Sequence, residues 1–252
     1  MGKVMKREKK QAHKRGSKKR IALCASIALL VTLTASFFIY TGVYYKADDA
    51  ALAALSSTET VTVAKTDYGY FFDSPSETDA LIFYPGGKVE ETAYAPLLRD
   101  IASGGCDVFL VKMPFRLAFF DQDKAGEVIS ETSYERYFIG GHSLGGVSAS
   151  SYAAEHPDEI DGLLLCAAYS VKDIPESIPT LSMYGSLDTV LSRGIYERCK
   201  RHIRGALTEY VIEGGNHAYF GSYGEQRGDG KATITPDEQR TAAAQQFFEQ
   251  LQ

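Results

Sequence analysis

The chain has 252 residues, of which 44% are hydrophobic and 23% charged, and its formal net charge is −5. These values are typical of an ordinary globular domain and exclude an intrinsically disordered chain.

The first twenty residues differ from the rest of the chain. They contain ten Lys or Arg residues and one Glu, a composition that could also bind nucleic acid. An apolar run follows at once, however: residues 21–40 (IALCASIALLVTLTASFFIY) include no charged residue and no proline. At about 1.5 Å per residue, a helix of this length spans a hydrocarbon core of roughly 30 Å. The sequence therefore predicts a basic cytoplasmic tail over 1–20, a transmembrane anchor over 21–45 and no nucleic-acid partner.

Aromatic residues gather at the far end of the apolar run, at positions 37, 38, 40, 44 and 45. Such rings settle at a membrane interface, and basic residues before a span favour a cytoplasmic N-terminus. We expect a single-pass protein of the cell membrane whose remaining domain is extracellular. A cleaved signal peptide is the alternative, but the run is long for one and no clean A-x-A site follows it.

A small polar segment, 46–59, is predicted to be a linker, and strand and helix patterns alternate over 60–252. Strands are expected at 60–64, 68–72, 80–84, 107–112, 134–139, 162–168, 181–184 and 209–212, the first two forming an antiparallel entry hairpin. Helices are expected at 93–103, 117–129, 147–155, 195–203 and 237–251. This alternation predicts one α/β domain with a mostly parallel sheet and helices on both faces.

The most specific motif is Gly141-His142-Ser143-Leu144-Gly145-Gly146, which lies between a predicted strand and a predicted helix. A serine on so sharp a turn has a strained backbone and an exposed hydroxyl, and glycines beside it let strand and helix approach. This is the nucleophile elbow, G-x-S-x-G. Ser143 is the predicted nucleophile, whereas the side chain of His142 should point away and is interpreted as structural.

Two further candidate catalytic residues lie just after later strands. Asp188 lies on the glycine turn after 181–184, and His217 lies in the loop after 209–212. Parallel strands collect such residues at their carboxyl-terminal edge. A serine hydroxyl needs a base and a group that orients the base, which here gives His217 and Asp188.

With the chain order Ser, Asp, His, the sequence resembles an α/β-hydrolase from about Thr60 to the C-terminus. It is similar more narrowly to a small bacterial group of membrane-anchored hydrolases without a lid. The resemblance is carried by Tyr84-Pro85-Gly86-Gly87-Lys88-Val89, Pro114-Phe115, the elbow, Gly185-Ser186-x-Asp188, Gly215-Asn216-His217-Ala218 and Phe220-Gly221. Only residues 169–180 stand where many members insert a helical lid, so we expect an open, shallow site.

An oxyanion hole needs two backbone N–H groups directed at the carbonyl oxygen as it gains charge. Leu144, after the nucleophile, is one expected donor. Gly87, in the loop after strand 80–84, is the other, with Lys88 in reserve. Lys88 and Arg116 are also candidate contacts for the substrate.

The resulting function is that of an extracytoplasmic carboxylesterase-like serine hydrolase that forms an acyl-enzyme with a small acyl substrate. Acyl transfer to a cell-envelope acceptor is the alternative, and a binding module without catalysis is less favoured. No cofactor is expected, and the spacing of His and Cys predicts no metal site. Three cysteines, at 106, 166 and 199, cannot all pair, and a bond between the first and last is left open.

Overall fold

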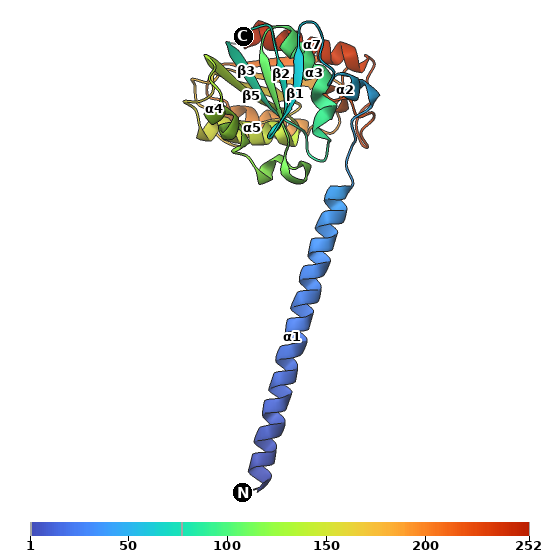
Figure 1. Cartoon of the computed structure of the whole chain (residues 1–252), viewed down its shortest axis with the longest axis vertical. Coiled ribbons are helices and arrows are strands. Elements are labelled where there is room, and N and C mark those ends of the chain that lie inside the picture. Colours follow the sequence, from blue (N-terminus) through green and yellow to red (C-terminus); the bar gives the residue numbers. More distant parts are fainter. Residues whose placement is uncertain (1, 77, 252) are drawn as a thin grey trace. The chain divides into compact units, whose positions relative to one another are not determined.

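The computed structural model describes residues 2–76 and 78–251 (Figure 1). They divide after Val43 into two compact units, an N-terminal helix and a domain that starts at Tyr44.

The domain is built on one eight-stranded sheet with the order β1-β2-β4-β3-β5-β6-β7-β8. The strands are β1 (Thr62–Thr66), β2 (Gly69–Asp73), β3 (Asp79–Tyr84), β4 (Asp107–Val111), β5 (Arg136–His142), β6 (Gly162–Cys166), β7 (Thr180–Gly185) and β8 (Leu207–Ile212). β2 is antiparallel to both β1 and β4, and all other neighbours are parallel. The entry hairpin and the mostly parallel sheet expected from the sequence are thus confirmed.

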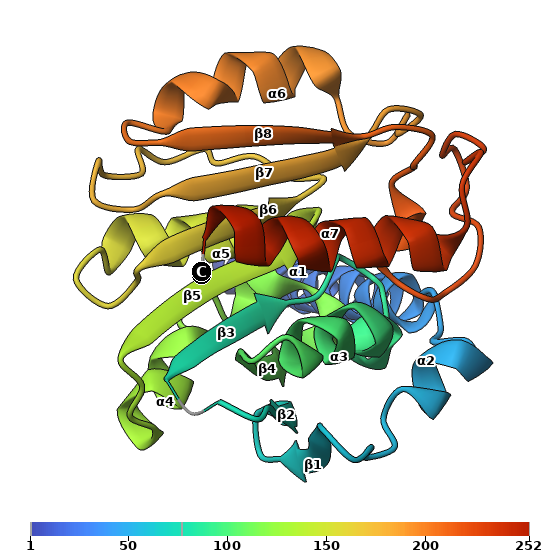
Figure 2. The same ribbon diagram turned by 90° about the horizontal axis from the view of Figure 1, so that it is seen from above.

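Helices cover both faces of this sheet (Figure 2). They are α2 (Asp49–Ala53), α3 (Ala95–Ser103), α4 (Lys124–Glu131), α5 (Leu144–Glu155), α6 (Arg193–Cys199) and α7 (Pro236–Gln250). α3 and α7 contribute to one hydrophobic cluster, and α4 and α5 to another. Because both faces are covered, every residue of β3, β4, β6 and β7 is buried, as continuous apolar strands require.

The helix expected over 117–129 is wrong in its first half. Two short 3-10 turns, η2 (Pro114–Arg116) and η3 (Ala118–Phe120), occupy that part, and α4 begins only at Lys124. The backbone of Phe115 and Arg116 has φ of 54° and 59°, and Asp121 has φ of −153°. None of these angles is helical, so no helix can run through this segment.

The segment 46–59, expected to be a linker, is packed on the domain over part of its length. Its short helix α2 is capped by Asp48, whose carboxylate accepts a hydrogen bond from the Ala51 N–H at 3.0 Å. The methyl groups of Ala51 and Ala54 are fully buried. Burial of these small side chains holds this part of the linker, which contains a short helix, against the domain.

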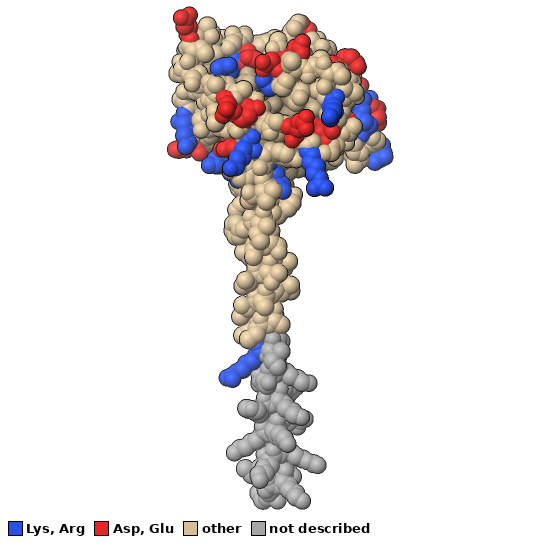
Figure 3. Space-filling view, turned by 90° about the vertical axis from the view of Figure 1, so that its right-hand side faces the viewer, with Lys and Arg blue, Asp and Glu red and all other residues tan. Residues whose placement is uncertain are grey.

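The N-terminal unit is the single helix α1 (Gly2–Gly42). Its stretch Leu23–Gly42 has a mean hydropathy of 2.1 and is long and apolar enough to cross a membrane. This stretch contains no charged residue, and the face of it shown in Figure 3 is uncharged. A signal sequence near an N-terminus has the same length and composition.

The carboxyl-terminal ends of the parallel strands form the edge on which the predicted site residues lie. β3 leads into the glycine loop at 85–88, β5 into Ser143, β7 into Asp188 and β8 into the loop that ends at His217. The connection from β6 to β7, residues 167–179, contains no helix. This edge is therefore not covered by a helical lid within the described domain.

Candidate active site

Ser143 occupies the strained turn between β5 and α5. Its backbone has φ of 52° and ψ of −121°, and its N–H donates to the Cys166 carbonyl at 2.9 Å. A Cβ on Gly141 would lie 2.6 Å from the Gly145 carbonyl carbon, and a Cβ on Gly145 would lie 2.2 Å from the Tyr84 oxygen. Both glycines are thus required by the close approach of helix and strand, as the motif predicts.

Asp188 and His217 form a buried hydrogen-bonded pair. The His217 Nδ1 lies 2.8 Å from Asp188 Oδ2, and their side chains are 2% and 0% exposed. The other carboxylate oxygen, Oδ1, accepts the backbone N–H groups of Val190 and Leu191, each at 2.8 Å. Three donors therefore hold one carboxylate without solvent, and the Nδ1 contact leaves Nε2 of His217 available for chemistry.

A pocket of about 250 Å³ lies over the elbow. Ser143, Leu144 and His217 line it together with Val147, Ala167, Ala168, Tyr169, Val190, Leu191 and Ser192. Most of these side chains are apolar, so the polar atoms of Ser143 and His217 face a largely hydrophobic space. Among the hydrogen bonds of the described residues, none joins the Ser143 hydroxyl to His217; the two side chains share the wall of the pocket.

The two expected oxyanion donors lie side by side. A Cβ on Gly87 would meet the Leu144 Cδ2 at 2.8 Å, so the glycine loop after β3 packs directly on the residue after Ser143. Within the described domain, the N–H groups of Gly87 and Leu144 donate to no protein acceptor. The N–H of Lys88, in contrast, donates to the Arg116 carbonyl at 2.8 Å. Gly87 is therefore the better candidate for the second donor, since the N–H of the reserve candidate Lys88 already has an acceptor.

Lys88 and Arg116, the candidate substrate contacts, lie on adjoining loops after β3 and β4. Besides the bond between their backbones, the Arg116 guanidinium stacks on the Tyr44 ring, 3.4 Å from its centroid. Both residues adopt positive φ, at 59° each. They border the glycine loop, next to Gly87.

A buried polar network behind the elbow was missed by the sequence analysis. The Gly86 N–H donates to the Tyr94 hydroxyl at 3.0 Å, and that hydroxyl lies 2.8 Å from Nδ1 of His142. His142 Nε2 lies 3.0 Å from the carbonyl of His217. Since this carbonyl only accepts, Nε2 carries the proton and the Tyr94 hydroxyl donates to Nδ1. The network thus joins the glycine loop to the backbone of His217.

Burial explains the charge state of this network. Desolvation, with His217 as a further cause, holds the pKa of His142 well below its usual value, so the ring stays neutral. Burial also raises the pKa of Tyr94, which keeps the hydroxyl proton needed for the bond to His142. His142 is structural as expected, but its partners include the loops of the site.

The loop that carries His217 is also held from α7. Gln239 is fully buried; its Oε1 accepts the Asn216 N–H at 2.9 Å, and its Nε2 donates to the Asn216 carbonyl at 2.8 Å. Asp229 Oδ2 accepts the N–H of Ala218 at 2.9 Å. The backbone on either side of His217 is therefore fixed by side chains from two other segments.

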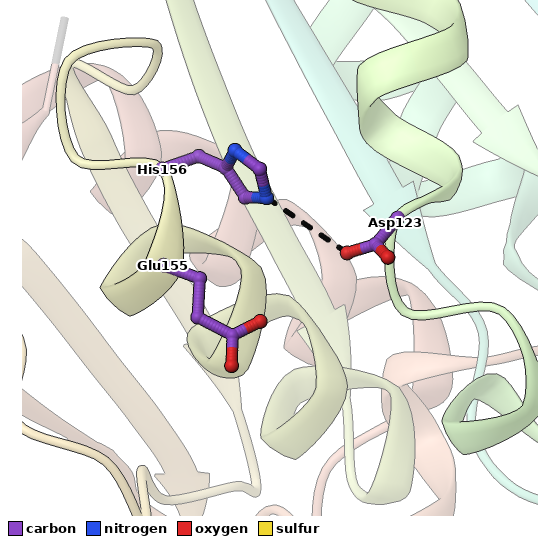
Figure 4. A group of neighbouring side chains, drawn as sticks. All are labelled: Asp123, Glu155 and His156. Atoms are coloured by element: carbon purple, nitrogen blue, oxygen red, sulfur yellow. Dashed lines mark ion pairs between the residues drawn. The ribbon is translucent and has the colours of Figure 1, made fainter.

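One group of side chains has the composition of a cation site: Asp123, Glu155 and His156, on the surface at the end of α5 (Figure 4). Within it, His156 Nε2 lies 3.8 Å from Asp123 Oδ1. The ammonium of Lys172 forms an ion pair with Glu155 and offsets its charge. We therefore interpret the group as surface ion pairs and assign it no metal.

The cysteines of the domain are all free thiols, so the bond left open between Cys106 and Cys199 does not form here. Burial raises the pKa of both Cys106 and Cys166 well above its usual value. These two thiols are small buried hydrophobic groups with no nucleophilic role.

Comparison with solved structures places this fold among hydrolases. A membrane phospholipase A described as a bacterial virulence factor aligns with a TM-score of 0.59 at 13% identity, over 92% of this chain and 98% of that one. The dienelactone hydrolase of Anabaena variabilis aligns with a TM-score of 0.55 at 13% sequence identity, over 77% of this chain and 100% of that one. The carboxylesterase CesB of Bacillus subtilis aligns with a TM-score of 0.54 at 11% sequence identity, over 81% of this chain and 95% of that one. At these identities the likeness is one of fold.

A search among curated proteins finds no significant match. The sequence model of the alpha/beta hydrolase family, in contrast, matches residues 80–241, which run from β3 through the elbow and both later loops into α7. The chain therefore belongs to the alpha/beta hydrolase family.

Proposed function

We propose that the protein is a membrane-anchored serine hydrolase that cleaves carboxylic esters outside the cytoplasm. One observation carries the proposal: His217, which is hydrogen-bonded to the buried Asp188, lines the same pocket as the strained Ser143. A structural ion pair would gain nothing from lying beside a half-buried serine on a strained turn, whereas a nucleophilic serine needs a base at this place.

In the proposed reaction, His217 Nε2 removes the proton of the Ser143 hydroxyl as Oγ attacks the ester carbonyl. The hydrogen bond between the serine hydroxyl and the histidine of such a site often forms only when substrate is bound. Asp188 keeps the proton of His217 on Nδ1 and stabilises the imidazolium that forms. The imidazolium then protonates the leaving alcohol, and water, activated by the same histidine, hydrolyses the acyl-enzyme to release the acid.

The N–H groups of Leu144 and Gly87 would stabilise the tetrahedral oxyanion. Two preorganised donors in a partly dry pocket stabilise the developing charge more than water can. In other hydrolases, removal of one such donor raises the activation barrier by about 3–4 kcal/mol. Their location side by side and their lack of other acceptors in the described domain support this role. Lys88 and Arg116 border the glycine loop, outside the residues that line the pocket, and are the proposed contacts of the substrate near its mouth.

The proposed division of the chain has a cytoplasmic tail over 1–20, an anchor over 21–45, a connecting segment over 46–59 and the hydrolase domain over 60–252. Basic residues before the apolar run support a cytoplasmic N-terminus. Protease added to intact cells should digest the domain and leave a short basic fragment. Mature protein recovered in the medium with its N-terminus beyond residue 40 would show cleavage instead.

The nucleophile is tested with a fluorophosphonate probe on the full chain. Ser143→Ala should abolish labelling and lower turnover of a soluble ester by about four orders of magnitude or more. Ser130→Ala, an exposed serine on α4, is the matched control and should label normally. Undiminished labelling of Ser143→Ala would refute the assignment, and product analysis with an alcohol or amine acceptor separates hydrolysis from acyl transfer.

A further inference from the structure

Three phenylalanine side chains form an exposed patch on the loop that follows β4. Phe115, Phe119 and Phe120 are 43%, 49% and 48% exposed. Their rings contact one another, with centroids 5.7 Å apart for Phe115 and Phe120 and 4.3 Å apart for Phe119 and Phe120. We call these three residues the phenylalanine cluster. Contiguous exposed apolar surface of this kind marks a site of contact with a partner or a membrane.

The loop is held in the conformation that exposes the cluster. Leu117 and Ala118, between the phenylalanines, are 5% and 1% exposed and pack inward. Phe115 and Arg116 have φ of 54° and 59°, a left-handed conformation that side chains adopt only where the surroundings hold it. Here the Arg116 carbonyl accepts the Lys88 N–H, and the Arg116 N–H donates to Met113 at 3.0 Å.

The same loop is fixed to the residue where the domain begins. The Arg116 guanidinium lies 3.4 Å from the centroid of the Tyr44 ring. The next residue, Tyr45, donates its N–H to the Lys88 carbonyl and accepts the Glu90 N–H, each at 2.8 Å. Tyr44 is thus part of the surface that carries the phenylalanine cluster.

Chain length then limits how far this surface can lie from a bilayer. The apolar stretch of α1 ends at Gly42, and two residues of extended chain reach at most roughly 7 Å. The polar interface of a bilayer is about 5–7 Å deep on each side. With α1 as the anchor proposed above, a loop stacked on Tyr44 would lie at the level of the lipid headgroups, where aromatic side chains are stable.

We infer that the phenylalanine cluster enters the lipid interface next to the anchor, and that the substrate is an ester lipid drawn from that leaflet. This inference rests on the proposed anchor and the proposed esterase activity. Lys46 follows Tyr45, whose N–H donates to the Lys88 carbonyl, and the ammonium groups of both lysines would attract anionic headgroups. Lys88 follows Gly87, which packs on Leu144 beside the nucleophile, so the lipid ester has a short path from interface to pocket.

The reaction would then split a lipid into an acid and an alcohol. Ser143 Oγ takes the acyl group from the ester, and the lipid alcohol leaves with the proton held by His217. Water supplies the oxygen and proton that release the fatty acid and restore the serine. No oxidant or further reactant is required.

Interface contact is tested by a readout that does not depend on catalysis. The chain contains no tryptophan, so Phe119→Trp introduces a single tryptophan, whose fluorescence is excited selectively. The full chain, also carrying Ser143→Ala to keep the lipids intact, is reconstituted into phosphatidylcholine and phosphatidylglycerol vesicles with brominated acyl chains. Tryptophan at 119 should be quenched strongly. Val211→Trp, at a 39% exposed position on the edge strand β8, should be quenched much less.

Equal quenching at both positions, or none at 119 in protein that floats with the vesicles, would overturn the inference. Failure to float would remove the anchor on which the inference rests and overturn it as well. Catalytic inactivity of the natural chain, in contrast, would refute the proposed function without changing the quenching result. The two failures are thus distinguishable.

The substrate class is tested with the double variant Phe119→Ser and Phe120→Ser in active full-length protein. Turnover of a vesicle lipid ester should fall about tenfold, because less apolar area enters the interface, while turnover of a soluble short-chain ester should be unchanged. Val211→Ser is the control and should change neither rate. Equal loss on both substrates, or no loss on vesicles, would overturn the assignment of a bilayer substrate.

Discussion

Replacement of Asp188 by Asn separates the orientation of His217 from the integrity of the fold. The asparagine oxygen would keep the two N–H bonds from Val190 and Leu191, but its amide would present a donor to His217 Nδ1 across 2.8 Å. The imidazole would respond by moving its proton to Nε2, where it blocks removal of the Ser143 proton. We expect kcat/KM to fall by about 10⁴, or about 5 kcal/mol in the barrier.

The assay combines initial rates on a soluble ester with the free energy of unfolding. Stability should change by less than about 1 kcal/mol for Asp188→Asn, whereas Asp188→Ala leaves two buried N–H groups unpaired at about 1–3 kcal/mol each. Asp173→Asn is the matched control, because Asp173 Oδ1 lies 2.7 Å from Nδ1 of His202 in an exposed pair. A folded Asp188→Asn protein with a tenth or more of the natural activity would refute the role of Asp188.

Three further substitutions test the network behind the site and the glycine packing. Tyr94→Phe removes the acceptor of the Gly86 N–H, so the free energy of unfolding measured in urea should fall by about 1–3 kcal/mol. For a soluble ester, kcat should fall while KM stays nearly unchanged. Unchanged stability and kcat would contradict the network. Gly145→Ala places a Cβ 2.2 Å from the Tyr84 oxygen and 2.4 Å from the Pro85 oxygen. Because both are backbone atoms that cannot move aside without a large energetic cost, the free energy of unfolding measured by thermal denaturation should fall by about 1–3 kcal/mol or more. Burial lowers the pKa of His142, so below about pH 6.5 this histidine binds a proton in the unfolded chain but not in the folded chain. The free energy of unfolding therefore falls as the pH decreases from there. His142→Gln should flatten this slope by up to about 1.4 kcal/mol per pH unit, measured by urea unfolding across the acidic range; an unchanged slope would refute the assignment.

The elements that the sequence predicted correctly are those with a local cause. The elbow follows from glycines within two residues of Ser143, and the positions of Asp188 and His217 follow from strands that end just before them. Parallel strands then bring these ends to one edge without any knowledge of long-range contacts. The catalytic roles of these residues stay predictions, because geometry alone does not measure turnover.

Features decided by distant contacts were missed. Tyr94 lies 48 residues before His142, and nothing in the local pattern distinguishes its hydroxyl from that of any other buried tyrosine. Apolar residues at 117–120 suggested a helix, but contact with Lys88 imposes positive φ at Arg116 instead. A signal for the true helix start was present, since Asp123 precedes Lys-Ala-Gly-Glu and aspartate is favoured just before a helix.

The two hydrogen bonds between the Gln239 side chain and the Asn216 backbone have a consequence for biosynthesis. Both hydrogen bonds that fix the backbone before His217 come from α7, so they form only after the ribosome has added residue 239 and the helix has folded. A nascent chain that has passed the elbow already carries Ser143, but its histidine has no fixed place. Ribosome-bound chains stopped before residue 236 should therefore resist the fluorophosphonate probe. The proposed active site would therefore become complete only after α7 has been synthesised and folded, well after the apolar N-terminal helix has been translated.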